Sequence, residues 1–190
     1  FPTRRSSDLL SVAAASFCAT EAPEPGIVAG FPWLDVQVRD LLVALPGICL
    51  APGKVSEAKS ILRAVLRRMR GGWLPKWMPR RKDSWGSPCP EATLWLFHVV
   101  QRLRPALSAE DDFLAEIYPK LLRAFIKLAG KRSSLAWLTE EGLLANGAPG
   151  QSLTWMDSGQ GEWGAVPRAG VAIEWPAATA PATRTRPPHA

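Results

Sequence analysis

The sequence predicts an all-α fold of the α/α-toroid type, in which paired helices are joined by long loops. Apolar residues in the middle of the chain recur at helical spacing, and no strand-like alternation extends beyond a few residues. The helices are separated by long stretches rich in glycine, proline and tryptophan. With 190 residues and 47% apolar content, the chain is large enough to form one hydrophobic core.

Four amphipathic helices are predicted, each with apolar residues at i, i+3 and i+4 and each ending near glycine or proline. The last one opens on a capping-box pattern at Ser108. Pro119 lies inside it, so a kink or break is expected near Tyr118. The predicted helices span residues 39–50, 56–69, 91–103 and 108–128.

Two long loops, 71–90 and 142–170, are candidates for function. Loops longer than about 15 residues in compact domains are usually functional or disordered, and tryptophan argues against disorder. A flat indole can stack on the apolar face of a sugar ring, although burial is the simpler expectation for any tryptophan, and we expect it for Trp95 and Trp137. The loop tryptophans are Trp73, Trp77, Trp85, Trp155 and Trp163.

Several classes of function are disfavoured by what the sequence lacks. No apolar run reaches the roughly 18 residues that cross a bilayer, so we expect no membrane association. Three widely spaced cysteines indicate neither a disulfide framework nor a zinc site, which favours the cytoplasm. His98 is expected to be structural, and nucleophile-elbow, P-loop and dinucleotide fingerprints are missing. We therefore predict no metal and no cofactor.

A basic stretch keeps nucleic-acid binding open as an alternative function. Residues 54–82 contain ten Lys or Arg and one Glu, with tryptophans that could stack on bases. However, Arg63, Arg67 and Arg70 lie opposite the apolar stripe of their helix, as residues of a solvated face do. We favour the solvated face and expect no nucleic-acid partner, with a basic helical nucleic-acid-binding module as the alternative.

Asp157 is the candidate general acid. It follows Trp155 closely and precedes Ser158 and Gly159, in a loop able to present it. Hydrolysis of a glycoside needs a carboxylic acid to protonate the leaving oxygen, and a second carboxylate to act as base or nucleophile. The pattern of tryptophan and carboxylate in a glycine-flanked loop is compatible with that chemistry.

Several short motifs, in this order, resemble the amylo-α-1,6-glucosidase domain of glycogen-debranching enzymes. They cover roughly residues 30–175, which is most of the chain between its two ends. The motifs are Phe31-Pro32-Trp33-Leu34-Asp35, Arg39-Asp40, Ala44-Leu45-Pro46-Gly47, Glu91-Ala92-Thr93-Leu94-Trp95, Gly142-Leu143-Leu144, Leu153-Thr154-Trp155-Met156-Asp157, and Pro167-Arg168 with Gly170 and Ile173-Glu174.

The resemblance implies an (α/α)6 toroid of the six-hairpin glycosidase type that hydrolyses α-1,6-linked glucose on glycogen or branched α-glucan, with inversion. A glucoamylase or trehalase type is the alternative within this fold. Asp157 matches the family's acid, and Arg39-Asp40 is similar to the pair that binds hydroxyls of the terminal glucose. The substrate-binding residues implied are Trp33, Asp35, Arg39, Asp40, Trp155, Arg168 and Glu174.

The chain departs from the family pattern in three respects. One is that Val171-Ala172 stands before Ile173-Glu174 where the family usually has Lys or a small residue followed by Pro. Residues 35–40 read Asp-Val-Gln-Val-Arg-Asp, whereas the family usually has Asp-Trp-Gly-Arg-Asp, so the spacing between the acids is one residue longer. The later toroid helices, and with them the second catalytic carboxylate, are expected to lie beyond this chain. We therefore expect a truncated toroid that is inactive by itself.

The two ends are expected to lie outside the domain. Residues 1–9 match a common sequencing-library adapter read in frame, and 10–29 form a lead-in. Residues 30–175 form the partial glucosidase domain. Residues 176–190 have no apolar period and are expected to be a disordered or frameshifted tail. Part of the net charge of +6 comes from these two ends.

Overall fold

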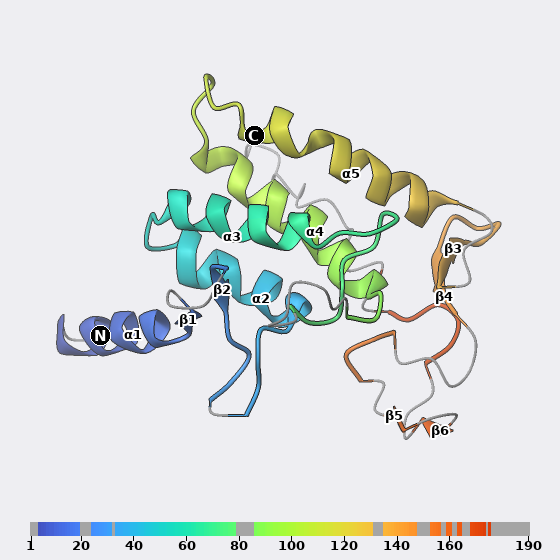
Figure 1. Ribbon diagram of the computed structural model, residues 1–190, viewed down its shortest axis with the longest axis horizontal. Helices are drawn as coiled ribbons and strands as arrows, with labels where there is room; N and C mark the ends of the chain where they lie inside the picture. The colour runs from blue at the N-terminus through green and yellow to red at the C-terminus, as the bar shows by residue number, and fades with distance from the viewer. Residues whose placement is uncertain are drawn as a thin grey trace, which may run out of the picture.

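The computed structural model describes residues 4–19, 24–31, 33–78, 86–130, 135–147, 153–156, 159–160, 163–164, 168–173 and 175. Within these residues the fold is mainly helical, with short antiparallel strand pairs (Figure 1). The helices are α1 (Arg4–Ser16), α2 (Val38–Leu45) with a π-helical turn (Pro46–Leu50), α3 (Val55–Arg67), α4 (Pro90–Leu103) with a 3₁₀ turn (Arg104–Ala106), and α5 (Phe113–Ala129).

The strands form three two-stranded antiparallel pairs, each two or three residues long. Such short strands add connections between loops rather than a sheet layer. The pairs are β1 (Cys18–Ala19) with β2 (Gly26–Ile27), β3 (Ala136–Leu138) with β4 (Leu144–Asn146), and β5 (Gly159–Gln160) with β6 (Trp163–Gly164). The prediction of a mainly helical fold is confirmed, whereas the strand pairs were not predicted.

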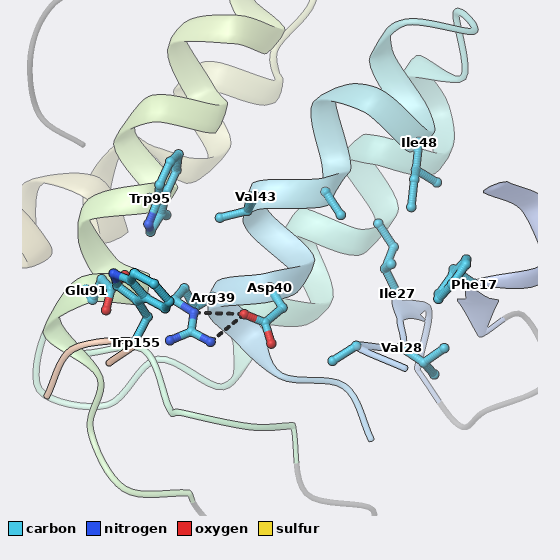
Figure 2. Close-up of a pocket in the computed structure, with 12 residues that line it drawn as sticks. Phe17, Ile27, Val28, Arg39, Asp40, Val43, Ile48, Glu91, Trp95 and Trp155 are labelled. Atoms are coloured by element: carbon cyan, nitrogen blue, oxygen red, sulfur yellow. Dashed lines mark hydrogen bonds and ion pairs between the residues drawn. The ribbon is translucent and has the colours of Figure 1, made fainter. Parts of the chain in front are cut away.

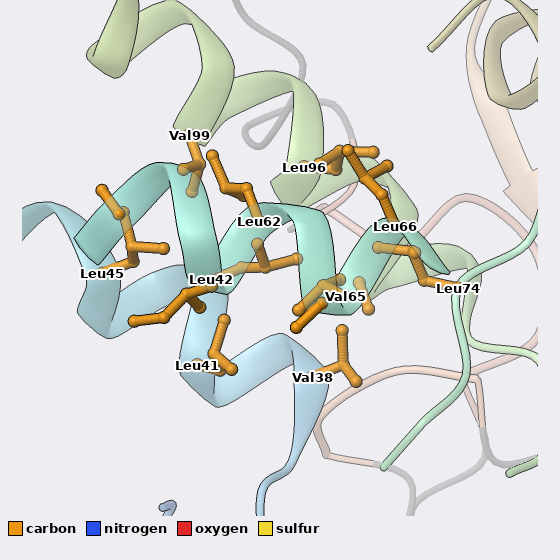
Figure 3. Packing of buried hydrophobic residues seen from close by; sticks show 14 of the residues in the cluster. Val38, Leu41, Leu42, Leu45, Leu62, Val65, Leu66, Leu74, Leu96 and Val99 are labelled. Carbon is orange, nitrogen blue, oxygen red and sulfur yellow. The ribbon is translucent and has the colours of Figure 1, made fainter. Parts of the chain in front are cut away.

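The main core lies where α2, α3 and α4 pack together (Figure 3). Each helix contributes one apolar stripe, because its buried residues recur at three- and four-residue intervals. Burying a leucine or valine of this kind contributes about 1.5–3 kcal/mol relative to leaving it exposed. The fully buried residues at this junction are Val38, Leu41, Leu42, Leu45, Leu62, Val65, Leu74, Leu96 and Val99.

The loop after α3 joins the beginning of α2 to the beginning of α4. The amide of Val38 donates to the Lys76 carbonyl at 3.0 Å. The amide of Leu74 donates to the buried Thr93 hydroxyl at 3.0 Å, and the Cys89 amide donates to the Leu74 carbonyl at 2.8 Å. These bonds hold the first turns of α2 and α4 next to each other, which is where the candidate site lies.

Helix α5 begins five residues later than predicted and continues through its proline. Residues 108–112 form turns, and the Asp111 carboxylate, not a capping-box serine, accepts a hydrogen bond from the Phe113 amide at 2.9 Å. Pro119 removes one helical hydrogen bond without ending the helix, because Ala115, whose carbonyl loses its partner, lies on the exposed face and can be hydrated. Of the kink or break predicted near Tyr118, the break is therefore wrong, because α5 continues through Pro119.

The basic stretch lies against carboxylates from elsewhere in the chain. Lys59 contacts Asp111 at 2.7 Å, and Arg63 forms a two-pronged pair with Glu116, with its shortest contact at 2.6 Å. Arg68 donates to Glu24 at 2.9 Å. Three of the basic residues are therefore paired within the chain, and the Lys59 and Arg68 pairs are largely shielded from solvent.

A second, smaller apolar cluster attaches Ala136, Leu144, Leu153, Ala172 and Trp175 to α4. Trp175 is fully buried, and Ala172 and Leu153 are almost so. All three belong to a cluster that includes Leu94 on α4 and Leu128 on α5. This cluster brings the segment before Asp157 back to the helical body.

Candidate functional site

A hollow of about 580 Å³ lies among β2, α2, α4 and the segment 153–156 (Figure 2). Its walls come from parts of the chain more than one hundred residues apart. One side is apolar, one side is charged, and two tryptophans lie at its edge. The lining residues are Phe17, Ile27, Val28, Ala29, Arg39, Asp40, Val43, Ala44, Ile48, Glu91, Trp95 and Trp155.

Arg39 and Asp40 lie in the first turn of α2 and form an ion pair on the charged side. The Arg39 Nε atom donates to Asp40 Oδ1 at 2.8 Å, and a terminal nitrogen of the same guanidinium lies 2.6 Å from the same oxygen. The side chains are 27% and 36% exposed, so both remain accessible from the hollow. A planar guanidinium beside a carboxylate offers donors and acceptors together, as recognition of neighbouring sugar hydroxyls requires.

Glu91 is a third charged residue of the hollow, in the first turn of α4. It is 2% exposed, unlike most glutamates, which stay on the surface. The first turn of a helix favours negative charge, since the unpaired amides there carry partial positive charge. The sequence prediction included Glu91 in a motif but not in the site. The signal that could have found it is a lone carboxylate at the start of an otherwise apolar helix.

The two tryptophans of the hollow have different surroundings. Trp155 is 57% exposed and belongs to the turn just before Asp157. Trp95 is half-buried on α4 and makes an edge-on contact with His98, with ring centroids 5.2 Å apart. The burial expected for Trp95 and Trp137 is found only in part, because both side chains are half-buried. The structural role expected for His98 agrees with this packing, and burial lowers its pKa.

The opposite side of the hollow is apolar. Phe17 and Ile27 face it from the β1–β2 region, and Val43 and Ile48 from α2 and its π-helical turn (Figure 2). Pockets that bind small molecules usually combine an apolar lining with a few placed polar groups. The hollow has this composition, and its volume lies within the usual 300–1,000 Å³.

Arg168 lies near the segment that carries Trp155 but does not line the hollow. A guanidinium nitrogen of Arg168 is 3.2 Å from the sulfur of Met156, and the Asn146 side-chain amide donates to the Arg168 carbonyl at 2.7 Å. These contacts connect β4 to the turn at 153–156. Arg168 therefore helps to hold that turn in place.

Trp33 and Asp35 lie in the loop between β2 and α2 and are not among the residues that line the hollow, although the Asp35 carbonyl accepts a hydrogen bond from the amide of the lining residue Ala29 at 3.3 Å. Trp33 is 87% exposed and Asp35 is also exposed. The loop turns back on itself through the Leu34 amide, which donates to the Gly30 carbonyl at 3.0 Å. The structure thus brings Arg39, Asp40 and Trp155 together, and leaves Trp33 and Asp35 outside the group.

Asp157 and Glu174, the two remaining predicted site residues, lie outside the described residues. Their chain neighbours are placed: Trp155 lines the hollow, and Trp175 is buried in the second cluster.

Within the described part of the chain, no cluster of His, Cys, Asp and Glu has the arrangement of a metal site. None of the helices described there combines the length and hydropathy needed to cross a bilayer. Burial raises the pKa of the Cys89 thiol to about 11, so this residue is a protonated helix cap at neutral pH.

Comparison with known proteins identifies the family to which most of the chain belongs. The family model for amylo-alpha-1,6-glucosidase matches residues 10–186. A search among curated proteins found no match. The matched residues include every residue that lines the hollow and the motifs that suggested the resemblance. The chain belongs to the amylo-alpha-1,6-glucosidase family.

Proposed function

We propose that this chain forms the glucose-binding part of a glycosidase that hydrolyses the α-1,6 linkage of glucose on glycogen or a branched α-glucan. Family membership supports glycoside hydrolysis in general. The hollow supports the finer proposal, since it joins a hydroxyl-binding ion pair to an exposed tryptophan two residues before Asp157. That convergence of Arg39, Asp40 and Trp155 is the observation on which the proposal rests.

In the proposed reaction, Asp157 is the general acid. It gives its proton to the glycosidic oxygen as the bond from that oxygen to the anomeric carbon breaks. A second carboxylate, which we place in the later part of the family domain, removes a proton from the attacking water. Attack on the opposite face inverts the anomeric configuration, and the enzyme's two carboxyl groups return to their starting state once protons exchange with solvent.

The other predicted residues receive roles according to their places. Arg39 and Asp40 bind hydroxyls of the terminal glucose, and Trp155 stacks on a sugar face beside the acid. Trp33 and Asp35, which lie outside the hollow, contact sugars farther along the glucan. Arg168 supports the turn at 153–156 that precedes Asp157, and Glu174 is a further substrate-binding residue of the proposal.

We also propose that the helices belong to an (α/α)6 toroid and that the enzyme works in the cytoplasm on a glucan partner. Helices α2 to α5 alternate with loops (Figure 1). The loop before α2 and the first turns of α2 and α4 contribute residues to the hollow. A toroid places active-site loops at one end of its helices in this manner.

The test replaces Asp157 with Asn in a family enzyme that carries this segment in its complete domain. We expect loss of glucose release from a branched limit dextrin, with an unchanged thermal unfolding temperature. A matched Asp112→Asn variant changes an exposed aspartate away from the hollow and should keep full activity. Glucose release that survives in the Asp157 variant would refute the role of general acid.

A further inference from the structure

We infer that Glu91 binds a sugar hydroxyl in the hollow, as a direct ligand-binding residue alongside Arg39 and Asp40. This inference deepens the proposed function and rests on it. Glu91 comes from α4, whereas the ion pair comes from α2, so the two helices would grip one sugar ring from different directions.

The position of Glu91 is the first argument. Its carboxyl group is almost fully buried, yet it lines the 580 Å³ hollow, and it gathers with Arg39 and Trp155 on one side of it (Figure 2). A ligand that fills the hollow therefore lies against a residue from which bulk water is largely excluded. Hydrogen bonds to charged groups in such places are stronger than neutral ones.

The second argument concerns a small cavity of about 20 Å³ behind the hollow. Arg39 and Glu91 line both spaces, and Lys76 lines the small one. Arg39 and Glu91 therefore lie between the hollow and the small cavity. Arg39 and Lys76 bring positive charge to the cavity that Glu91 also lines, and the N-terminus of α4 adds partial positive charge at the same place.

The capacity of the group is the third argument. A carboxylate has about four acceptor positions on its two oxygens, so contacts with protein groups leave room for a hydroxyl donor. Arg39 offers only donors to a ligand, whereas Asp40 already receives two contacts from Arg39 on one oxygen. Glu91 adds the acceptor capacity that a polyhydroxylated ring needs.

The simpler explanation is that Glu91 only balances the charges of Arg39 and Lys76. The two explanations differ in which ligand groups matter. A residue that accepts a hydrogen bond from one hydroxyl discriminates against the one deoxy sugar that lacks it. A residue that only balances charge affects all sugars equally.

The experiment measures binding of glucose and of its 2-, 3-, 4- and 6-deoxy forms to the 190-residue chain by titration calorimetry. The variants are Glu91→Gln, which keeps the shape of the side chain, and Glu110→Gln, an exposed control. We expect Glu91→Gln to weaken glucose binding about 10-fold or more, and the control to leave it unchanged. One deoxyglucose should bind the unaltered chain about 10-fold more weakly than glucose does. In the Glu91→Gln variant this ratio should become clearly smaller, because a neutral amide oxygen is a weaker acceptor than a carboxylate.

Each other outcome has a definite meaning. If every deoxy sugar loses the same affinity in both proteins, the inference is overturned and the proposed function stands. The same holds if Glu91→Gln binds glucose normally while Arg39→Ala does not. If the unaltered chain binds no glucose, the hollow is not a glucose site, and both proposals fail. If Glu91→Gln does not fold, Glu91→Asp enters the same comparison, because it retains the charge and withdraws the carboxyl group by one methylene.

Discussion

Replacing Thr93 with Val should destabilise the fold measurably, although the two side chains have nearly the same shape. The Thr93 hydroxyl is fully buried, accepts a hydrogen bond from the Leu74 amide at 3.0 Å, and donates to the Cys89 carbonyl at 3.0 Å. Valine removes both bonds. The Cys89 carbonyl keeps the Thr93 amide as a donor at 3.1 Å, so its loss is small. The Leu74 amide, in a residue that is also fully buried, is left without a partner.

An unsatisfied buried donor costs about 1–3 kcal/mol, so we expect Thr93→Val to lower the free energy of unfolding by about 2 kcal/mol. The measurement is urea unfolding followed by tryptophan fluorescence. Thr93→Ser is the control, since it retains the hydroxyl and loses one buried methyl group, for about 1 kcal/mol. A Thr93→Val variant within about 0.5 kcal/mol of the unaltered chain would refute the view that this hydroxyl joins the loop to α4.

Two further predictions concern titration and reactivity. Burial raises the pKa of the Cys49 and Cys89 thiols to about 11 from an ordinary 9.0. An aromatic disulfide reagent should therefore modify the part-exposed Cys18 first, and three thiols that react equally fast would contradict this. The free energy of unfolding should also fall as pH rises from about 9 to 11, because Cys49 and Cys89 ionise in that range only in the unfolded chain. The hydrogen bond from Lys59 lowers the pKa of Asp111 below its ordinary 3.8. The ionised Asp111 therefore stabilises the fold above pH 3.8, and this contribution is lost as the pH falls below 3.8. In urea unfolding, Asp111→Asn should lower the free energy of unfolding less at about pH 3 than at about pH 5. Equal losses at the two pH values would contradict the pairing.

The helices could be predicted from the sequence because their signals are local. The start of α4 coincides with Pro90, and the end of α3 falls near Gly71 and Gly72, as propensity alone requires. The beginning of α5 could not be placed, since it depends on a tertiary contact. Lys59 holds Asp111 where its carboxylate caps the Phe113 amide, and the local capping-box pattern loses to that arrangement.

The candidate site was only partly predictable, for a related reason. The Arg39-Asp40 pair and Trp155 could be named from motifs, yet nothing local indicates that they share a hollow with Glu91. Their meeting depends on the loop bonds to Leu74 and Lys76 and on the second apolar cluster. Trp33 illustrates the converse, since its motif indicated the site and its backbone turn directs it to solvent.

The outer face of α5 carries a stripe of exposed apolar side chains opposite its buried face. Tyr118, Leu122, Phe125 and Ile126 recur at helical spacing and are 42–61% exposed. A helix that is apolar on both faces is normally covered on both. In a pure solution of this chain, the cover available is the same face of another copy.

We therefore expect the purified chain to self-associate through this stripe, with a sedimentation coefficient that rises with concentration. Phe125→Gln combined with Ile126→Gln removes two of its largest side chains and keeps good helix formers. Losing about 1.5 kcal/mol or more for each side chain should weaken association by at least about 100-fold. Ile173→Gln is the matched control, since Ile173 is 79% exposed but lies outside α5. Association that persists unchanged in the double variant would mean that another surface, such as the exposed leucines of α1, joins the copies.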